Sequence, residues 1–181
     1  MGVARLAELA WSRRNITARG RDDSSHGAGA TEGSREGHWS RRTYPIMVAM
    51  HVLAIAGTAV WGASRPNRGW LALLFAVQPL RAWVLVTLGS RWNARGAVAE
   101  TTVVATDGPY TYIRHPNYLV VGIELLSLPL AFGLRWLATA VFVANVVLIA
   151  IRIYDEEELL RRLPGWSEHF ATRKRVIPGI L

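Results

Sequence analysis

Two neighbouring apolar runs, Tyr118–Leu134 (YLVVGIELLSLPLAFGL) and Trp136–Ile153 (WLATAVFVANVVLIAIRI), decide the fold class of this chain. Each comes close to the roughly 20 residues that an α-helix needs to cross a hydrocarbon layer of about 30 Å. Two similar runs precede them, from about Tyr44 to Ala63 and from about Trp70 to Leu88. So many apolar runs in 181 residues would leave too little polar surface to solvate one buried core. We therefore predict an all-α, multi-pass membrane bundle of about four transmembrane helices.

The basic residues lie between and beside these apolar runs. The formal net charge is +8, although 51% of the residues are apolar. A basic chain can bind nucleic acid by neutralising phosphates, but basic residues that flank membrane spans are better explained by anionic lipid headgroups and the positive-inside rule. We expect membrane lipids as partners and no nucleic acid. An even number of crossings places residues 89–117 and 154–181 on the same face as the N-terminal segment. Because this face carries most of the arginines, we expect it to be the cytoplasmic face of the cell membrane. We expect the cofactor pocket and the active site on this face.

The chain divides into a basic N-terminal segment, residues 1–43, and a membrane domain, residues 44–181. Much of the first part is rich in Arg, Gly, Ser and acidic residues, and its repeated glycines interrupt any helix. We expect that segment to be partly disordered. The chain has no cysteine, which excludes disulfides, thiolate metal ligands and cysteine nucleophiles. No metal site is predicted.

Several polar residues fall inside the predicted spans, where a charge costs at least about 2.5–3.5 kcal/mol and therefore usually faces the bundle interior and is paired. They are His51, Gln78, Arg81, Glu124 and Asn145. Two interpretations are equally open. Arg81 and Glu124 could form an ion pair that fixes helix packing, or they could line a substrate channel. Pro79 should also kink the second span, because it removes a backbone hydrogen bond.

The stretch Asp107–Tyr118 (DGPYTYIRHPNY) is the first candidate for chemistry. Its Gly-Pro pair predicts a turn, and the residue before Pro116 is biased away from helix, so a short loop leads into a helix start. Its Arg and His side chains offer hydrogen-bond donors and its tyrosines offer aromatic faces, which suits an adenine ring, a ribose and a carboxylate. An interfacial belt of aromatic and basic residues would have the same composition.

The second candidate is Arg152–Leu160 (RIYDEEELL), where the fourth span leaves the membrane. Arg152 and Glu156 are four residues apart and share a helix face. The run of four acidic residues is costly unless cations neutralise it. It could be a solvated helix continuation paired with Arg161 and Arg162. Alternatively, one carboxylate accepts hydrogen bonds from a ligand while Arg152 binds an anionic acceptor.

The two motifs, in this order, resemble the isoprenylcysteine carboxyl methyltransferase (ICMT) family. The matching residues are Gly108-Pro109-Tyr110, Arg114-His115-Pro116-Asn117-Tyr118, Arg152, Glu156-Glu157 and Leu160. The resemblance, over about residues 70–181, implies S-adenosylmethionine as cofactor. It also implies cofactor contacts from the His-Pro-x-Tyr stretch, the tyrosine before it and the first acid of the pair, with Arg152 on the substrate side. The candidate cofactor-binding residues are Tyr110, Arg114, His115, Pro116, Asn117, Tyr118, Glu156 and Glu157.

A narrower resemblance is to a bacterial subgroup often found beside type III polyketide synthases. It rests on Gln78-Pro79-Leu80-Arg81-Ala82-Trp83, Leu88-Gly89-Ser90-Arg91-Trp92 and Tyr44-Pro45 with Met47, Val48 and His51. Members of that subgroup methylate hydroxyls of alkylpyrones or alkylresorcinols. The resemblance implies a lipid-like acceptor and a functional link to such a synthase. A prenylcysteine-like carboxylate is the other acceptor that the family implies.

Methyl transfer from a sulfonium needs the acceptor oxygen, the methyl group and the sulfur to be aligned, and water to be excluded. A carboxylate acceptor would need no base, whereas an enol or phenol must lose a proton, for which His115 or Glu124 are candidates. Arg152 or Arg81 could stabilise an anionic acceptor through charge-assisted hydrogen bonds. The candidate catalytic residues are Arg152, Arg81 and Glu124.

Two other functions stay open. An NADPH-dependent membrane reductase of the sterol-reductase kind has a similar architecture, and a catalytically silent membrane protein could use the same motifs for packing alone. A Rossmann-type methyltransferase is excluded, because no Gly-x-Gly-x-x-Gly follows a strand-like run.

Overall fold

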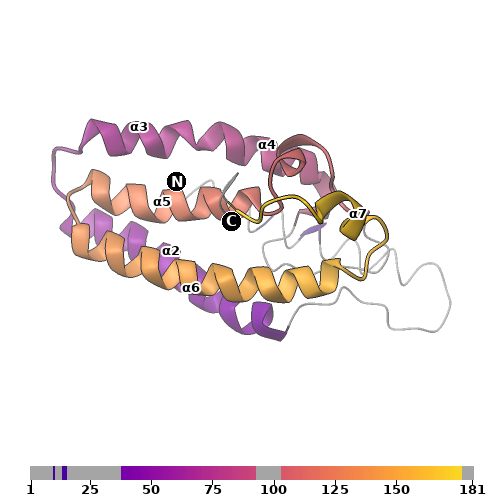
Figure 1. Cartoon of the computed structure of the whole chain (residues 1–181). Helices are drawn as coiled ribbons and strands as arrows, with labels where there is room; N and C mark the ends of the chain where they lie inside the picture. Colours follow the sequence, from indigo (N-terminus) through magenta and orange to yellow (C-terminus); the bar gives the residue numbers. More distant parts are fainter. Residues whose placement is uncertain (1–9, 11–13, 16–37, 93–102, 177–181) are drawn as a thin grey trace.

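The computed structural model describes residues 10, 14–15, 38–92 and 103–176, and the regular elements in these residues are all helical (Figure 1). The elements are α2 (His38–Trp61), α3 (Arg68–Ala76), α4 (Gln78–Leu88), η1 (Gly89–Arg91), η2 (Gly108–Thr111), α5 (Pro116–Ala131), α6 (Arg135–Leu160) and α7 (Trp166–Phe170). Within the described ranges no strand forms, and a single residue pair, Ile113 and Lys174, makes an isolated parallel bridge. The prediction of an all-α bundle is confirmed.

Three helical segments are long and apolar enough to cross a membrane: Arg42–Trp61, Arg68–Arg91 and Arg135–Leu160. The fourth apolar helix, α5, has 16 residues, which corresponds to a length of about 24 Å. It ends at Ala131, before the predicted end at Leu134, because Gly133 adopts φ 81° and stops the helix. The four predicted runs therefore correspond to three candidate spans and one shorter helix.

The second span is broken near its middle, as Pro79 predicts. α3 ends at Ala76 and α4 begins at Gln78, with Pro79 in the first turn of α4, where a missing amide costs least. The side-chain amide of Gln78 donates to the backbone carbonyl of Leu74 over 2.9 Å. That contact gives the Leu74 carbonyl, in the last turn of α3, a hydrogen bond at the break.

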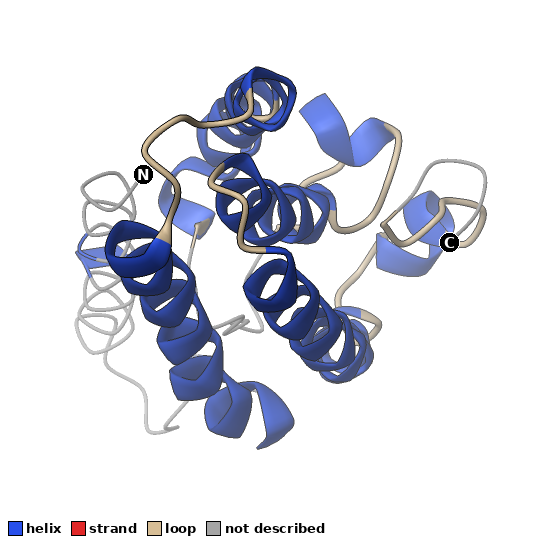
Figure 2. Cartoon of the chain, turned by 90° about the vertical axis from the view of Figure 1, so that its left-hand side faces the viewer, coloured by secondary structure: helices blue, strands red, loops and turns tan. Residues whose placement is uncertain are grey.

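The core lies between α2, α5 and α6, and α5 also packs against α3 and α4 (Figure 2). The core residues are Met50, Ala54, Val121, Leu125, Leu134, Leu137, Val141 and Leu148. Large apolar side chains also face outward, among them Val60 on α2, Val86 on α4 and Val147 on α6, which are 70%, 79% and 56% exposed. An apolar exterior around buried polar residues suits a lipid environment.

The loop before α5 and the segment after α6 lie at the same end of the bundle, where α4 also ends (Figure 1). The described residues of 89–117 and of 154–181 thus lie at one end, as the even number of runs predicted. Most of the predicted disordered segment, residues 1–43, lies outside the described residues, although α2 begins at His38, ahead of the predicted start at Tyr44.

Candidate cofactor and acceptor site

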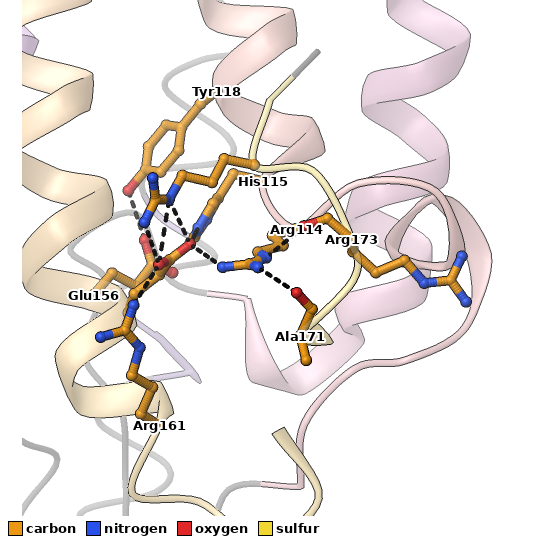
Figure 3. A network of polar contacts seen from close by, with 9 residues as sticks. Arg114, His115, Tyr118, Glu156, Arg161, Ala171 and Arg173 are labelled. Carbon is orange, nitrogen blue, oxygen red and sulfur yellow. Dashed lines mark hydrogen bonds and ion pairs between the residues drawn. The ribbon is translucent and has the colours of Figure 1, made fainter. Parts of the chain in front are cut away.

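The start of α5 and the end of α6 meet through Tyr118, Glu156 and Arg152. Figure 3 shows the contact between Tyr118 and Glu156. The Tyr118 hydroxyl donates to Glu156 Oε2 over 2.7 Å, and Arg152 Nε donates to the same hydroxyl over 3.4 Å. Tyr118 is 8% exposed and Arg152 2% exposed. The first motif and the second motif, 34 or more residues apart in the chain, thus form one cluster.

Local sequence fixes where Tyr118 stands. His115 precedes α5 with a non-helical backbone (φ −127°, ψ 61°), and Pro116 occupies the first helical position. The Tyr118 amide bonds to the His115 carbonyl over 3.1 Å, so Tyr118 belongs to the first turn. The His115 and Tyr118 rings lie 5.5 Å apart between centroids. The helix start therefore presents two aromatic rings together at the cluster.

Tyr110 reaches the same cluster from η2. Gly108 has φ 58°, and a Cβ there would overlap the Thr87 hydroxyl, so only glycine lets η2 approach α4 this closely. Burial raises the pKa of the Tyr110 hydroxyl well above its ordinary value, and the negative charge of Glu156 raises it further. Tyr110 therefore stays protonated, and its hydroxyl keeps a proton that it can donate in a hydrogen bond.

Glu157, adjacent to Glu156 in the chain, faces a different set of side chains. It is 1% exposed. Its Oε1 lies 3.0 Å from Arg114, 3.3 Å from His115 Nε2 and 3.2 Å from Arg175, and its Oε2 lies 3.3 Å from Arg161. Both oxygens are thus held by cations, so Glu157 joins the loop before α5 to the chain after α6.

The chain after α6 runs alongside the first motif. The amides of Arg114 and His115 donate to the carbonyls of Lys174 and Arg175 over 2.9 and 2.8 Å. Arg114 Nε also donates to the Arg173 carbonyl over 2.8 Å (Figure 3). The Arg173 guanidinium bonds to the Thr111 carbonyl. Sequence reasoning did not single out residues 173–175. Their run of basic residues is the only local signal for this pairing.

Glu156 differs from Glu157 because one of its two carboxylate oxygens has no hydrogen-bond or ion-pair partner among the described residues. It is half-buried, and its hydrogen bond from Tyr118 uses Oε2. Within the described parts of the chain, Oε1 of Glu156 makes no hydrogen bond or ion pair. Of Glu156 and Glu157, Glu156 is therefore the one that can accept hydrogen bonds from a ligand.

The other predicted catalytic pair, Arg81 and Glu124, lies elsewhere. Arg81 on α4 makes a 3.0 Å ion pair with Glu124 on α5, and Gln78 donates to Glu124 over 2.9 Å. Both charged side chains are buried. Glu124 follows Tyr118 by six residues, which places it about 9 Å along α5 and on a different side of the helix. The structure brings Arg152, but not Arg81 and Glu124, to the Tyr118 and Glu156 cluster.

The remaining residues of the first motif take different positions. Pro116 is buried, and Asn117 is half-buried with an Oδ1 atom that has no partner among the described residues. Tyr112, expected with the other tyrosines, is 64% exposed and packs edge-on against Trp83 at 6.4 Å. Tyr112 therefore packs on the outer side of α4, against Trp83, and is not part of the cluster.

The model of the isoprenylcysteine carboxyl methyltransferase (ICMT) family matches residues 70–162, just over half of the chain. The chain belongs to this family. The matched range contains both motifs and the Tyr118, Arg152 and Glu156 cluster. A protein of Bacillus subtilis strain 168, the "uncharacterized protein YpbQ", is 31% identical over 165 residues, which are 88% of this chain and 91% of that protein. Family membership and the apolar helices together make the chain a multi-pass membrane methyltransferase.

Proposed function

We propose that the chain transfers a methyl group from S-adenosylmethionine to an oxygen atom of a lipid-like acceptor, at the cluster formed by Tyr118, Arg152 and Glu156. The observation that carries the proposal is the meeting of a half-buried carboxylate, two tyrosine hydroxyls and a buried guanidinium at one end of an apolar bundle. The donor chemistry of these residues, taken with the ICMT family match, supports this cofactor and this reaction.

The residues fit S-adenosylmethionine, which presents a ribose diol, an ammonium, a carboxylate and an adenine ring. Oε1 of Glu156 can accept hydrogen bonds from the diol or the ammonium, and these are the stronger, charge-assisted kind. Tyr110 contributes a protonated hydroxyl, and the His115 and Tyr118 rings offer aromatic surfaces. When bound, the cofactor supplies an activated methyl group, so the protein needs to position the reactants and keep water out.

Arg152 is the residue we assign to the acceptor. Its guanidinium is buried, and its Nε bonds to the Tyr118 hydroxyl, which fixes the side chain beside the cluster. A buried guanidinium binds an anionic oxygen through charge-assisted hydrogen bonds about twice as strong as neutral ones. It would hold a carboxylate acceptor or the oxygen of an ionised phenol or enol.

His115 is better placed than Glu124 to accept a proton from a hydroxyl acceptor. Its Nε2 faces the Glu157 carboxylate at 3.3 Å, and a proton on Nε2 would leave Nδ1 as the basic nitrogen. Glu124 is paired with Arg81 away from the cluster. A prenylcysteine-like carboxylate would need no base, so a base requirement distinguishes the acceptor classes.

We further propose that the site faces the cytoplasm at the cell membrane and that the acceptor's apolar tail lies among the helices. The basic residues beside the site, Arg161, Arg162 and Arg175, are about half exposed and suit a cytoplasmic face with anionic lipids. The two acceptor classes are a prenylcysteine-like carboxylate and an alkylpyrone or alkylresorcinol hydroxyl, the second with a functional link to a type III polyketide synthase.

The test is equilibrium binding of S-adenosylmethionine to the detergent-purified protein, with NADPH as the competing ligand. We expect saturable S-adenosylmethionine binding that NADPH does not displace, followed by methyl transfer to an alkylresorcinol or a prenylcysteine analogue. Binding of NADPH in its place would make the protein a reductase, and binding of neither ligand would identify a silent membrane protein.

A further inference from the structure

Asn145 is buried in the core-facing side of α6 with no hydrogen-bond partner among the described residues. It is 1% exposed, and neither its Nδ2 nor its Oδ1 atom is bonded. Its neighbours on the same helix face, Val141 and Leu148, belong to the apolar core. A buried amide without partners costs free energy, because water satisfied those groups in the unfolded chain. An apolar residue would be more favourable here unless the amide binds something.

A glycine of the facing helix, Gly122, lies opposite Asn145. A Cβ at Gly122 on α5 would lie 3.9 Å from Asn145 Nδ2 and 3.9 Å from the Phe142 ring, which is ordinary contact. Glycine is therefore not required there by close packing or by its backbone conformation. Its effect is that α5 places no side chain opposite the amide.

This polar position continues the proposed acceptor site into the bundle. Asn145 precedes Arg152 by seven residues, so both lie on one face of α6, about 10 Å apart along the axis. Gly122 follows Tyr118 by four residues, so both lie on one face of α5, about 6 Å apart along the axis. α5 and α6 pack side by side along their length (Figure 1). An acceptor held by Arg152 could extend between these faces toward Asn145.

We propose that Asn145 binds a hydroxyl of the acceptor's headgroup other than the oxygen that is methylated. The inference rests on the proposed function. A carboxamide offers one donor group and one acceptor atom, and a hydroxyl both donates and accepts. A charged group is disfavoured, because the carboxamide supplies no opposite charge in an apolar surrounding. Asn145 is then a specificity-determining residue that selects acceptors with a second hydroxyl, as in an alkylresorcinol.

The test compares two probes of equal tail length, 5-pentadecylresorcinol with two ring hydroxyls and 3-pentadecylphenol with one. With S-adenosylmethionine as donor, we expect the wild-type protein to prefer the resorcinol by about tenfold or more in kcat/KM, because a site built for a hydroxyl rejects an analogue that lacks it. Asn145→Leu should reduce that preference to about twofold or less by slowing the resorcinol. Its affinity for S-adenosylmethionine should match the wild type, which also shows that it is folded.

Two further variants keep the test decisive. Gly122→Ala places a methyl group beside the amide without overlap, and we expect it to reduce the preference even if Asn145→Leu does not fold. Ser127→Ala removes another buried, unpartnered polar atom from α5, and we expect it to keep the preference.

A wild-type protein that binds S-adenosylmethionine but shows no preference, or methylates neither probe, overturns the Asn145 assignment alone. A preference unchanged in both the Asn145 and Gly122 variants overturns it as well, since the amide is then structural. Absence of S-adenosylmethionine binding overturns the proposed function itself.

Discussion

The Tyr118 hydroxyl lies 2.7 Å from Oε2 of Glu156, and this hydrogen bond fastens the first turn of α5 to the last turns of α6. The same hydroxyl accepts from Arg152 at 3.4 Å. Tyr118 thus stands between the carboxylate that we assign to the cofactor and the guanidinium that we assign to the acceptor. The two ligands would meet where these side chains meet, which is the requirement of a transfer between them.

Glu156→Gln should weaken S-adenosylmethionine binding about tenfold to a hundredfold, because a neutral amide replaces the carboxylate in hydrogen bonds to the ligand. Equilibrium binding in detergent measures the change, and thermal unfolding should be near that of the wild type. Glu158→Gln is the matched control. Glu158 is 62% exposed and pairs only with Arg162 among the described residues, so its loss should leave the affinity unchanged. Equal affinities for all three proteins would remove Glu156 from the cofactor site.

Arg152→Ala should lower kcat/KM for the acceptor by about a hundredfold, since a buried charge-assisted contact to the acceptor is lost. The affinity for S-adenosylmethionine should change by less than about threefold, because Arg152 is on the other side of Tyr118. Arg152→Lys keeps the charge without the planar fork and should recover part of the rate. Steady-state kinetics with a lipid acceptor, alongside cofactor binding, separates the two effects. A variant that loses cofactor affinity and keeps turnover at saturation would reverse the assignment.

The overall architecture could be predicted because it depends on local sequence. Long apolar runs mark the helices, and Pro79, in the first turn of α4, marks the break between α3 and α4. The end of α5 at Ala131 was not predicted. The apolar run continues to Leu134, but the backbone at Gly133 ends the helix earlier. Hydropathy alone does not register such a backbone change.

The candidate site could be predicted only in part, because its contacts join distant segments. The pairing of residues 173–175 with residues 113–115 leaves almost no trace in either segment's sequence. Likewise, Glu156 and Glu157 are equivalent in a run of acids, but adjacent residues on a helix point about 100° apart. One therefore faces Tyr118, and the other faces three arginines and the His115 ring. Only the packing of α6 distinguishes Glu156, which we assign to the cofactor, from Glu157, which the arginines hold.

Glu157→Gln should loosen the C-terminal segment and lower the free energy of unfolding by about 3–5 kcal/mol, because several cations lose their buried counter-charge. Hydrogen exchange gives a local readout. The amides of Arg114 and His115 bond to the carbonyls of Lys174 and Arg175, so both should exchange faster in the variant, while amides within α2 should not. Glu158→Gln again serves as the control. Unchanged exchange at both amides would show that Glu157 does not hold the segment.

Arg81→Ala and Glu124→Gln should each lower the thermal midpoint strongly, since either change leaves a buried charge without its partner and costs about 3–5 kcal/mol. The double variant Arg81→Met with Glu124→Leu removes both charges together and should recover most of that loss, because well-packed apolar residues often replace a buried ion pair at no cost. This variant also decides between packing and catalysis. Glu124 makes its ion pair with α4, whereas Tyr118 makes its hydrogen bond with α6. We therefore expect a stable double variant to retain turnover within about threefold. A stable double variant that binds S-adenosylmethionine normally but no longer methylates its acceptor would instead identify the pair as part of the acceptor channel.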